Sequence, residues 1–199
     1  MNKKGTFICI EGLDGSGKTT QTKLITQKLR KSHNAVYTTE PSHGKIGTFI
    51  RNSYLYCEKR LSSVIEALLF AAERIEHVET EVLPALHQGK LVISDRYIYS
   101  SLAYQGAAGL SLEWIEKINE QALKPDLAVF IDVDPKIVMS RLKPKKSVME
   151  NMETQRKVRE IYLKFVEKGS LTRINGDKSK NEVAKEVYAV VMKFLNASR

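Results

Sequence analysis

Short apolar runs alternate with longer helical patterns along the chain. The runs are rich in β-branched residues, as in TFICIE at residues 6–11 and LAVFIDV at residues 127–133. Five of them are predicted as strands: residues 6–11, 35–38, 91–94, 127–133 and 171–174. Apolar residues at helical spacing predict helices over about residues 18–31, 61–87, 112–123, 135–142, 149–168 and 180–195.

This alternation predicts an α/β fold. Strands that are apolar almost throughout are typical of a parallel sheet, so we expect a mainly parallel, five-stranded sheet with helices on both faces. Right-handed connections place the carboxyl ends of the strands along one edge, where ligands bind in such sheets. The chain has 199 residues and no internal repeat or Pro/Gly-rich linker, so residues 1–199 are expected to form one domain.

The longest helical pattern, residues 61–87, is expected to bury one apolar face. In its first half that face is marked by Val64, Ile65, Leu68, Leu69 and Ala72. Pro84 has no backbone N–H and is therefore expected to kink or divide the helix, which Gly89 then ends.

A glycine-rich segment follows the first predicted strand directly. Residues 12–19 (GLDGSGKT) match the phosphate-binding pattern G-x-x-x-x-G-K-[ST]. The glycines let the backbone turn tightly and point its N–H groups at phosphate oxygens. Lys18 can supply a cation to the β- and γ-phosphates, and the Thr19 hydroxyl can bind Mg²⁺. A strand before the pattern and a helix after it favour a nucleotide site, and thus a P-loop NTPase fold, over a simple linking turn.

A second candidate site lies at the end of the third predicted strand, at Asp95 and Arg96. A carboxylate that ends a parallel strand beside a phosphate loop is placed to organise Mg²⁺, but an Asp here could equally cap the following helix. Arg96 favours the first interpretation, because a guanidinium can bind a phosphate through two hydrogen bonds.

The composition shows that the chain is basic, but it does not identify what the chain binds. A formal net charge of +9 fits nucleic-acid binding, a site for polyanionic small molecules or a lysine-rich surface. Cys9 and Cys57 have no Cys-x-x-Cys spacing, so neither a disulfide framework nor a metal cage is predicted. No apolar run approaches the roughly 20 residues that span a bilayer, and the N-terminus does not resemble a signal peptide. We therefore expect a cytoplasmic protein without a membrane segment.

Several further motifs, together with the phosphate loop, make the chain similar to the thymidylate kinases over nearly its whole length. The shared segments include FICIEGLD at residues 7–14, TEP at 39–41, LFAAER at 69–74, DRY at 95–97, SS at 100–101, AYQG at 103–106 and LKPD at 123–126. The block from residue 95 to residue 106 is the most specific, whereas Glu-Pro or Phe-x-x-x-Arg alone would be weak. The resemblance implies transfer of the γ-phosphoryl group of ATP to dTMP, which gives dTDP and ADP.

The resemblance also assigns residues to the base and sugar of the acceptor. It implies that Phe70 stacks on the pyrimidine and that Arg74, one helical turn further on, donates to the thymine O4. From their spacing alone, Phe70 would rather be core and Arg74 a surface cation. Ser100 and Ser101 match positions that contact the base edge. Tyr104 matches the residue that crowds the sugar 2′ position, although it could also be an ordinary packed aromatic.

Other residues are assigned to the acceptor phosphate and its surroundings. Arg96 is expected to hold the phosphate, together with Arg51. Asp14 matches a carboxylate near the sugar 3′-hydroxyl, and Glu40 is expected to orient the acceptor-side arginines. Gln105, in the same AYQG block, is assigned to the substrate side as well.

On the ATP side, the resemblance implies Mg²⁺ as the cofactor, bound through Thr19 and Asp95, and a catalytic set of Lys18, Arg96 and Asp95. The residues expected to bind ATP are Gly12, Leu13, Asp14, Gly15, Ser16, Gly17, Lys18, Thr19, Thr20 and Arg141. Some relatives carry an arginine where this chain has Gly15, so the basic segment at about 141–150 is expected to act as a short lid, although it could be a solvated run of charges. Glu11 is given no role beyond ending the first strand.

Two alternatives to this interpretation are weighed against it. A kinase of the same fold could act on another nucleotide or on a nucleoside, without needing Phe70, Arg74 and Tyr104 together. A nucleic-acid-stimulated P-loop ATPase would explain the charge, but no nucleic-acid motif is present, and ATP and dTMP are the expected partners. The resemblance also implies a homodimer, with no nucleic-acid or membrane partner.

Overall fold

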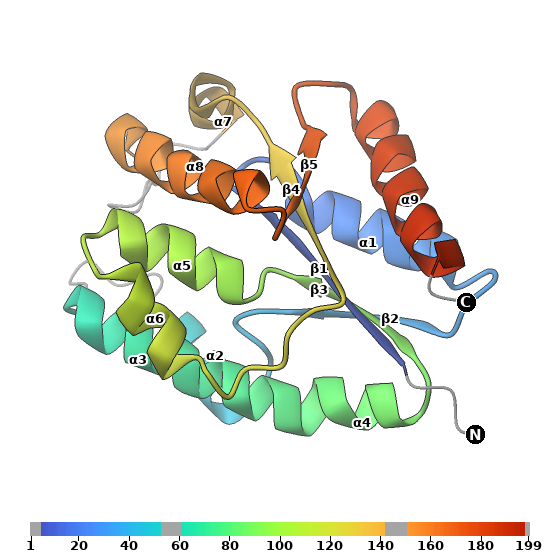
Figure 1. The fold of residues 1–199 in the computed structure, drawn as a ribbon, viewed down its shortest axis with the longest axis horizontal. Helices are drawn as coiled ribbons and strands as arrows, with labels where there is room; N and C mark the ends of the chain where they lie inside the picture. Colours follow the sequence, from blue (N-terminus) through green and yellow to red (C-terminus); the bar gives the residue numbers. More distant parts are fainter. Residues whose placement is uncertain (1–4, 53–60, 142–150, 198–199) are drawn as a thin grey trace.

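The computed structural model describes residues 5–52, 61–141 and 151–197. Its centre is a five-stranded sheet in which every pairing is parallel, in the order β2-β3-β1-β4-β5 (Figure 1). The strands are β1 Thr6–Gly12, β2 Ala35–Thr39, β3 Leu91–Asp95, β4 Leu127–Asp132 and β5 Thr172–Asn175. The prediction of a mainly parallel five-stranded sheet is therefore confirmed.

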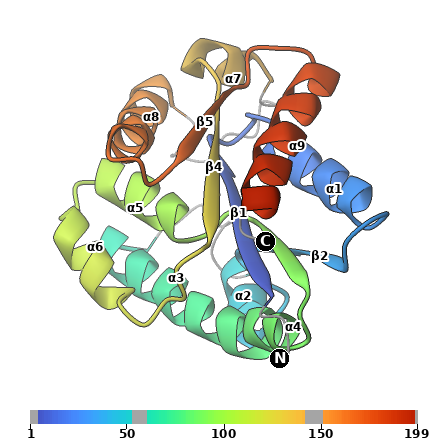
Figure 2. The same cartoon turned by 45° about the vertical axis from the view of Figure 1, so that its right-hand side comes forward.

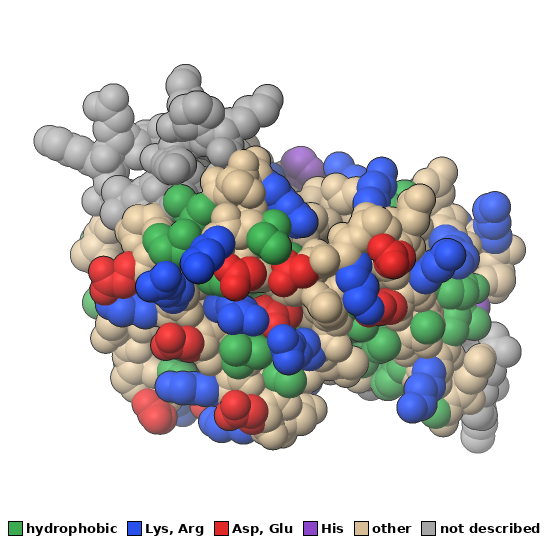
Figure 3. Space-filling view, turned by 90° about the horizontal axis from the view of Figure 1, so that it is seen from above, with side chains coloured by type: hydrophobic (Ala, Val, Ile, Leu, Met, Phe, Trp, Pro, Cys, Tyr) green, Lys and Arg blue, Asp and Glu red, His purple; other side chains and the backbone are tan. Residues whose placement is uncertain are grey.

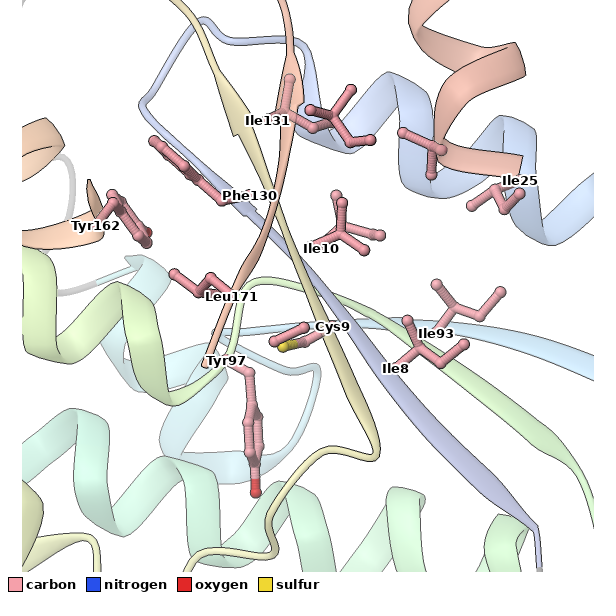
Figure 4. Packing of buried hydrophobic residues seen from close by; sticks show 14 of the residues in the cluster. Ile8, Cys9, Ile10, Ile25, Ile93, Tyr97, Phe130, Ile131, Tyr162 and Leu171 are labelled. Carbon is pink, nitrogen blue, oxygen red and sulfur yellow. The ribbon is translucent and has the colours of Figure 1, made fainter. Parts of the chain in front are cut away.

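The central strands are apolar because both of their faces are covered. Side chains of β1 and β4 such as Ile8, Ile10 and Phe130 are fully buried, and they pack with residues of the surrounding helices (Figure 4). Burial of this kind removes apolar surface from water on each side of the sheet and is the main stabilising contribution to such a core.

The helices follow the strands and cover both faces of the sheet. They are α1 Lys18–Leu29, α2 Lys45–Ile50, α3 Ser63–His77, the π-helix η2 Val78–Val82, α4 Leu83–His87, α5 Ile98–Ala107, α6 Leu112–Ile118, α7 Pro135–Arg141, α8 Met152–Glu167 and α9 Lys180–Ala197. Helices α1 and α9 lie against one face, and α3, α4, α5 and α8 lie on the other side (Figures 1 and 2). The prediction of helices on both faces is thus confirmed.

Two helices are absent from the pattern-based prediction. Neither α2 nor α5 shows clear apolar periodicity, because α5 mixes Ser, Tyr, Gln and Gly with its apolar residues. The residue directly before α5, Tyr97, also provides no side-chain cap. Both helices are stabilised by neighbouring elements: α2 packs against α3, and α5 packs against α3, α6 and α8.

The expected core face of the long helix is wrong in its first half. Val64, Ile65 and Leu68 are 44%, 46% and 47% exposed, and Ile75 further along is 37% exposed. We call these four residues the α3 apolar stripe. The face of α3 that is turned inward is instead partly polar, with Glu66, Glu73, Arg74 and His77 all buried. These polar side chains are stable in the interior because each is hydrogen-bonded to a residue outside the helix. The α3 apolar stripe, by contrast, has no covering element among the described residues.

The helix is not divided near Pro84: the backbone stays helical from α3 through η2 into α4, and the effect expected of the proline takes the form of a widened turn. Residues Val78–Val82 are π-helical, and α4 starts at Leu83 with the proline in its first turn. Pro84 has no N–H to donate within an α-helical turn, and a widened turn directly before it lets the helical run continue.

The sheet register brings the functional segments to one edge. Ile10 of β1 pairs with Asp95 of β3, and Gly12 pairs with Ile131 of β4. The phosphate loop, the Asp95–Arg96 turn and the end of β4 therefore leave the sheet side by side. Within the ranges that the structure describes, no helix is both long enough and apolar enough to cross a membrane.

Candidate active site

The turn between β1 and α1 has the backbone that the phosphate-loop pattern requires. Gly15 and Gly17 have φ angles of 86° and 89°, a region in which a Cβ is strained. A Cβ on Gly12 would lie 2.5 Å from Ser16 Oγ, so the tight turn excludes a side chain there. The N-terminus of the twelve-residue helix α1 thus faces the turn without a side-chain cap, which leaves its first N–H groups available to an anion.

Three side chains converge on Asp14 inside this loop. Lys18 Nζ lies 3.2 Å from Asp14 Oδ1, and Arg96 pairs with the same oxygen at a shorter distance. Tyr104 donates its hydroxyl to Asp14 Oδ2 at 3.2 Å and accepts the Asp14 backbone N–H at 3.0 Å. Burial by itself would raise the pKa of Asp14, but Arg96 and Lys18 hold it well below its usual range. Asp14 is therefore ionised between two cations.

The pKa values of both cations are shifted by their surroundings. Burial and the neighbouring Arg96 lower the pKa of Lys18, whereas Asp14 opposes both effects. Burial also disfavours the charge of Arg96, but Asp14 raises the pKa of that guanidinium well above its usual range. Two positive groups this close, with a single shared carboxylate, favour the arrival of further negative charge such as phosphate.

Arg96 lies in a strained turn between β3 and α5. Its φ of 74° makes it the non-glycine residue of the described chain with a left-handed backbone. Its N–H donates to Ile10 O at 3.0 Å, and its guanidinium donates to Ser100 Oγ at 2.8 Å and lies over the Tyr104 ring at 5.1 Å. Strain of this kind persists where the surroundings over-determine the conformation, and it is typical of functional sites.

Asp95 and Thr19 are the expected Mg²⁺ ligands. Asp95 is buried at the end of β3; its Oδ2 accepts from Tyr37 OH at 3.4 Å, and its Oδ1 has no hydrogen-bond partner in the described structure. Thr19 is exposed in the first turn of α1, as is Thr20. Within the described residues no group of three or more His, Cys, Asp and Glu side chains could enclose a metal ion. One carboxylate and one hydroxyl fit Mg²⁺ that is held largely by nucleotide phosphates and water.

Arg74, expected to contact the base, is fully enclosed. Its Nε and NH2 lie 3.0 and 2.7 Å from Glu40 Oε2, NH2 donates to Ser101 Oγ at 3.0 Å, and NH1 donates to Asn119 Oδ1 at 2.5 Å. The guanidinium carries five N–H donors, so these contacts leave one donor of NH1 without a partner in the described chain. Phe70, one turn earlier on α3, is half-buried. The alternative from spacing alone, that Arg74 is a surface cation, is wrong, because the side chain is 1% exposed.

Two residues that hold Glu40 were not predicted from the sequence, His77 and Thr38, which bonds to His77 in turn. His77 Nδ1 lies 3.2 Å from Glu40 Oε1, and its Nε2 lies 2.6 Å from Thr38 Oγ1. Thr38 also donates to Glu81 Oε2 at 2.8 Å, so its hydroxyl accepts from His77 and both ring nitrogens donate. Burial would lower the pKa of His77, but the hydrogen bond and the charge of Glu40 raise it, in accord with a charged ring. The spacing of Arg74, His77 and Glu81 on one helix was the available signal.

The remaining predicted residues divide between two ends of the site. Arg51 donates through Nε to Ser42 O at 3.3 Å, and its NH2 is buried with no partner in the described structure. Gln105 of α5 donates to Glu66 Oε1 of α3 at 3.3 Å. Ser101 faces Arg74, whereas the hydroxyl of Ser100 faces Arg96.

On the expected ATP side, the structure describes only some of the predicted residues. Leu13 is buried under the loop, and Arg141 is exposed at the end of α7. The expected lid at about 141–150 lies, apart from Arg141, outside the described residues. A buried carboxylate at the end of β4, Asp132, pairs with Arg159 of α8 at 2.6 Å and with Arg173 of β5 at 2.7 Å. These contacts anchor α8 next to the phosphate loop.

Comparison with known proteins gives one consistent result. A family model described as thymidylate kinase matches residues 10–187. A probable thymidylate kinase of Pyrococcus abyssi is 45% identical over 197 residues, covering 94% of this chain and 96% of its own length. Proteins with the same description from Pyrobaculum aerophilum and Staphylothermus marinus are 43% and 37% identical, and each alignment covers at least 93% of both chains.

Proposed function

The chain belongs to the thymidylate kinase family, and from that premise we propose that it transfers the γ-phosphoryl group of ATP to dTMP, giving dTDP and ADP. The observation that carries the proposal is the convergence of Lys18, Arg96 and Tyr104 on Asp14, inside a phosphate loop. Phosphoryl transfer needs two anions held in line, and this arrangement supplies paired cations at the point where a donor and an acceptor phosphate would meet.

In the proposed reaction the chain contributes positioning and charge rather than a nucleophile. The amides of residues 12–17 and Lys18 would hold the β- and γ-phosphates of ATP, and Arg96 with Arg51 would hold the acceptor phosphate. An acceptor phosphate oxygen then forms a bond to the γ-phosphorus as the bond to the β,γ-bridging oxygen breaks, and ADP leaves. When bound, Mg²⁺ would neutralise phosphate charge, with Thr19 and Asp95 as its protein ligands.

The base and sugar of the acceptor would lie between α3 and α5. Phe70 would stack on the pyrimidine, and the free NH1 donor of Arg74 would reach the O4 carbonyl. Glu40 and Ser101 hold the Arg74 guanidinium by hydrogen bonds, and Gln105 links α5 to Glu66 of α3. Tyr104 crowds the sugar and would disfavour a 2′-hydroxyl, so deoxyribonucleotides are the proposed acceptors.

An acceptor comparison tests the proposal. Turnover would be measured with MgATP and dTMP, dUMP, dCMP, UMP or AMP, and dTMP is expected to give the highest kcat/KM. If AMP or UMP were preferred by a wide margin, the chain would be a kinase of the same fold for another nucleotide. ATP hydrolysis stimulated by DNA would instead favour the nucleic-acid alternative. Figure 3 speaks against that alternative for the face it shows, because basic side chains there are interspersed with acidic ones.

The proposal includes a homodimer formed through the α3 apolar stripe. The stripe runs along one side of the helix, and Phe49 of the adjoining helix α2 is 50% exposed. Large apolar side chains in a row, without a covering element in the described chain, mark an association surface, and a two-fold axis would let the stripe cover itself. A cytoplasmic location is also proposed, in keeping with ATP as the donor.

Substituting Leu68 at the centre of this stripe is expected to separate the dimer. Leu68→Glu would place two like charges close together across the axis in an apolar surface, so the molecular mass in solution should fall to that of the monomer. Light scattering after size-exclusion chromatography measures this directly. Ala189→Glu adds the same charge to an exposed site on α9 and should leave the mass unchanged. If the Leu68→Glu protein stayed dimeric, the dimer interface would not be the α3 apolar stripe.

A further inference from the structure

A buried carboxylate at the end of β1, Glu11, joins three elements of the site. Its side chain is 0% exposed. Oε1 accepts the Tyr97 N–H at 2.9 Å, and Oε2 accepts the hydroxyls of Ser100 at 2.6 Å and Tyr162 at 3.1 Å. The donors come from the turn after β3, from α5 and from α8, while Glu11 itself directly precedes the phosphate loop. Glu11 therefore does more than end strand β1, because its carboxylate accepts hydrogen bonds from three other parts of the chain.

Two of these hydrogen bonds act on the segment that carries Arg96. Tyr97 starts α5 without a side-chain cap of its own, and Glu11 supplies that cap together with a negative charge at the helix N-terminus. Ser100 donates to Glu11 and at the same time accepts from Arg96 NH1 at 2.8 Å. Glu11 therefore holds the residue after Arg96 by its backbone and the Arg96 guanidinium through one intervening hydroxyl. The left-handed backbone of Arg96 needs such support, because it is disfavoured by itself.

The third hydrogen bond ties this cluster to the core and to α8. Tyr162 is fully buried, and its ring stacks on Phe130 of β4 at 4.6 Å with an interplanar angle of 16° (Figure 4). Its hydroxyl also lies 3.1 Å from Ser100 Oγ. The ring is thus fixed by packing, and its hydroxyl presents a donor at a set position.

We propose that Glu11 is a positioning residue for phosphoryl transfer, which orients Arg96 through Tyr97 and Ser100 with Tyr162 as its support. This inference rests on the proposed function, since Arg96 is the group expected to hold the acceptor phosphate. Glu11 itself does not reach the loop surface, so its effect is on the geometry of transfer and falls on kcat more than on the KM for ATP.

The protonation state of Glu11 gives the inference a distinct signature. Burial raises the pKa of Glu11 to about 7, although hydrogen bonds from Ser100, Tyr162 and Tyr97 and the charge of Arg96 oppose the rise. Cys9 of the same strand and Tyr99 of α5 are the other titratable groups that interact with it. When Glu11 is protonated, one of its oxygens becomes a hydrogen-bond donor. It then displaces one of the hydroxyl groups that donate to the ionised carboxylate. Activity carried by the ionised form therefore falls as the pH drops below about 7.

The test is steady-state kinetics of Glu11→Gln and Tyr162→Phe from pH 5.5 to 9 with dTMP and MgATP. Glu11→Gln should lower kcat by roughly tenfold to a hundredfold with little change in the KM for ATP. The fall in kcat at low pH, here called the acid decline, should also lack the part that comes from protonation of Glu11. The ionisation of dTMP itself affects all variants alike. Tyr162→Phe keeps the ring but removes a donor to the ionised carboxylate, so its acid decline should move to higher pH.

Glu73→Gln is the matched control. Burial and the nearby Glu40 raise the pKa of Glu73 to about 7 as well, but its carboxylate accepts the Ser42 N–H at 2.5 Å, away from Arg96. This variant should keep the wild-type acid decline. If Glu73→Gln lost the decline and Glu11→Gln retained it, or if Glu11→Gln had the wild-type kcat at every pH, the inference would be overturned. Should Glu11→Gln fail to fold, the direction of the Tyr162→Phe shift decides.

Failure of the proposed function would look different. A wild-type protein that phosphorylates another acceptor, but not dTMP, would refute the substrate and leave the role of Glu11 to be measured on that acceptor.

Discussion

Lys18→Ala is expected to reduce phosphoryl transfer at least about a thousandfold while the protein stays folded. The Lys18 ammonium lies at the start of α1 between Leu13 O and Asp14 Oδ1, each at 3.2 Å, and it is the lysine of the phosphate loop. Without it, charge that develops between the β- and γ-phosphates is left to the backbone amides alone. The loss should appear in kcat, measured as dTDP formation at saturating dTMP and MgATP.

The fold should survive this change for an electrostatic reason. Lys18 is buried beside Arg96, which disfavours its charge, so its removal also relieves a repulsion between two cations. Asp14 keeps its ion pair with Arg96. Thermal unfolding close to that of wild type checks this expectation. Lys23→Ala, which removes an exposed lysine from the same helix, should leave kcat within about twofold of wild type. Retention of activity by Lys18→Ala would exclude the phosphate loop as the catalytic site.

Arg74→Ala is expected to affect both stability and acceptor binding. The guanidinium is paired with Glu40 at 2.7 Å, and both side chains are almost fully buried. Removing one partner leaves Glu40 charged in the interior with only His77 beside it, which should cost about 3–5 kcal/mol of unfolding free energy. The same change removes the donor proposed for the thymine O4, so kcat/KM for dTMP should fall by roughly a hundredfold.

A second substitution separates the two effects. Arg74→Ala combined with Glu40→Gln removes the stranded charge, so it should recover part of the lost stability in chemical denaturation. It supplies no donor to the base, so the loss in kcat/KM for dTMP should persist, and the preference for dTMP over dCMP should shrink. If Arg74→Ala matched wild type on dTMP, the residue would have no part in the acceptor site.

The phosphate loop and the strands could be predicted from the sequence because their signals are local. The glycine spacing at residues 12–17 indicates positions where the backbone takes positive φ angles, and continuous apolar runs indicate strands that are buried on both faces. Helices α2 and α5 lacked such a signal, because their stability comes from the elements that they pack against.

The orientation of α3 shows where local pattern fails. Val64, Ile65 and Leu68 have the spacing of a core face, yet the helix turns Arg74 and His77 inward. Periodicity identifies an apolar side of a helix, but it does not say whether that side meets the sheet or another surface. The inward face is decided by partners that are distant in sequence, such as Glu40 and Asn119.

The sequence by itself determined the fold class, the phosphate loop and the residue types of the site. Only the tertiary structure decided how those residues act together: Asp14, Arg96 and Tyr104 meet because parallel β1 and β3 end at the same edge, and Glu11 becomes a shared acceptor for α5 and α8. The physical reason is that ionisable side chains take their charge state and orientation from burial and from neighbours in space. Those neighbours lie 82 to 151 residues apart along this chain, where no sequence period connects them.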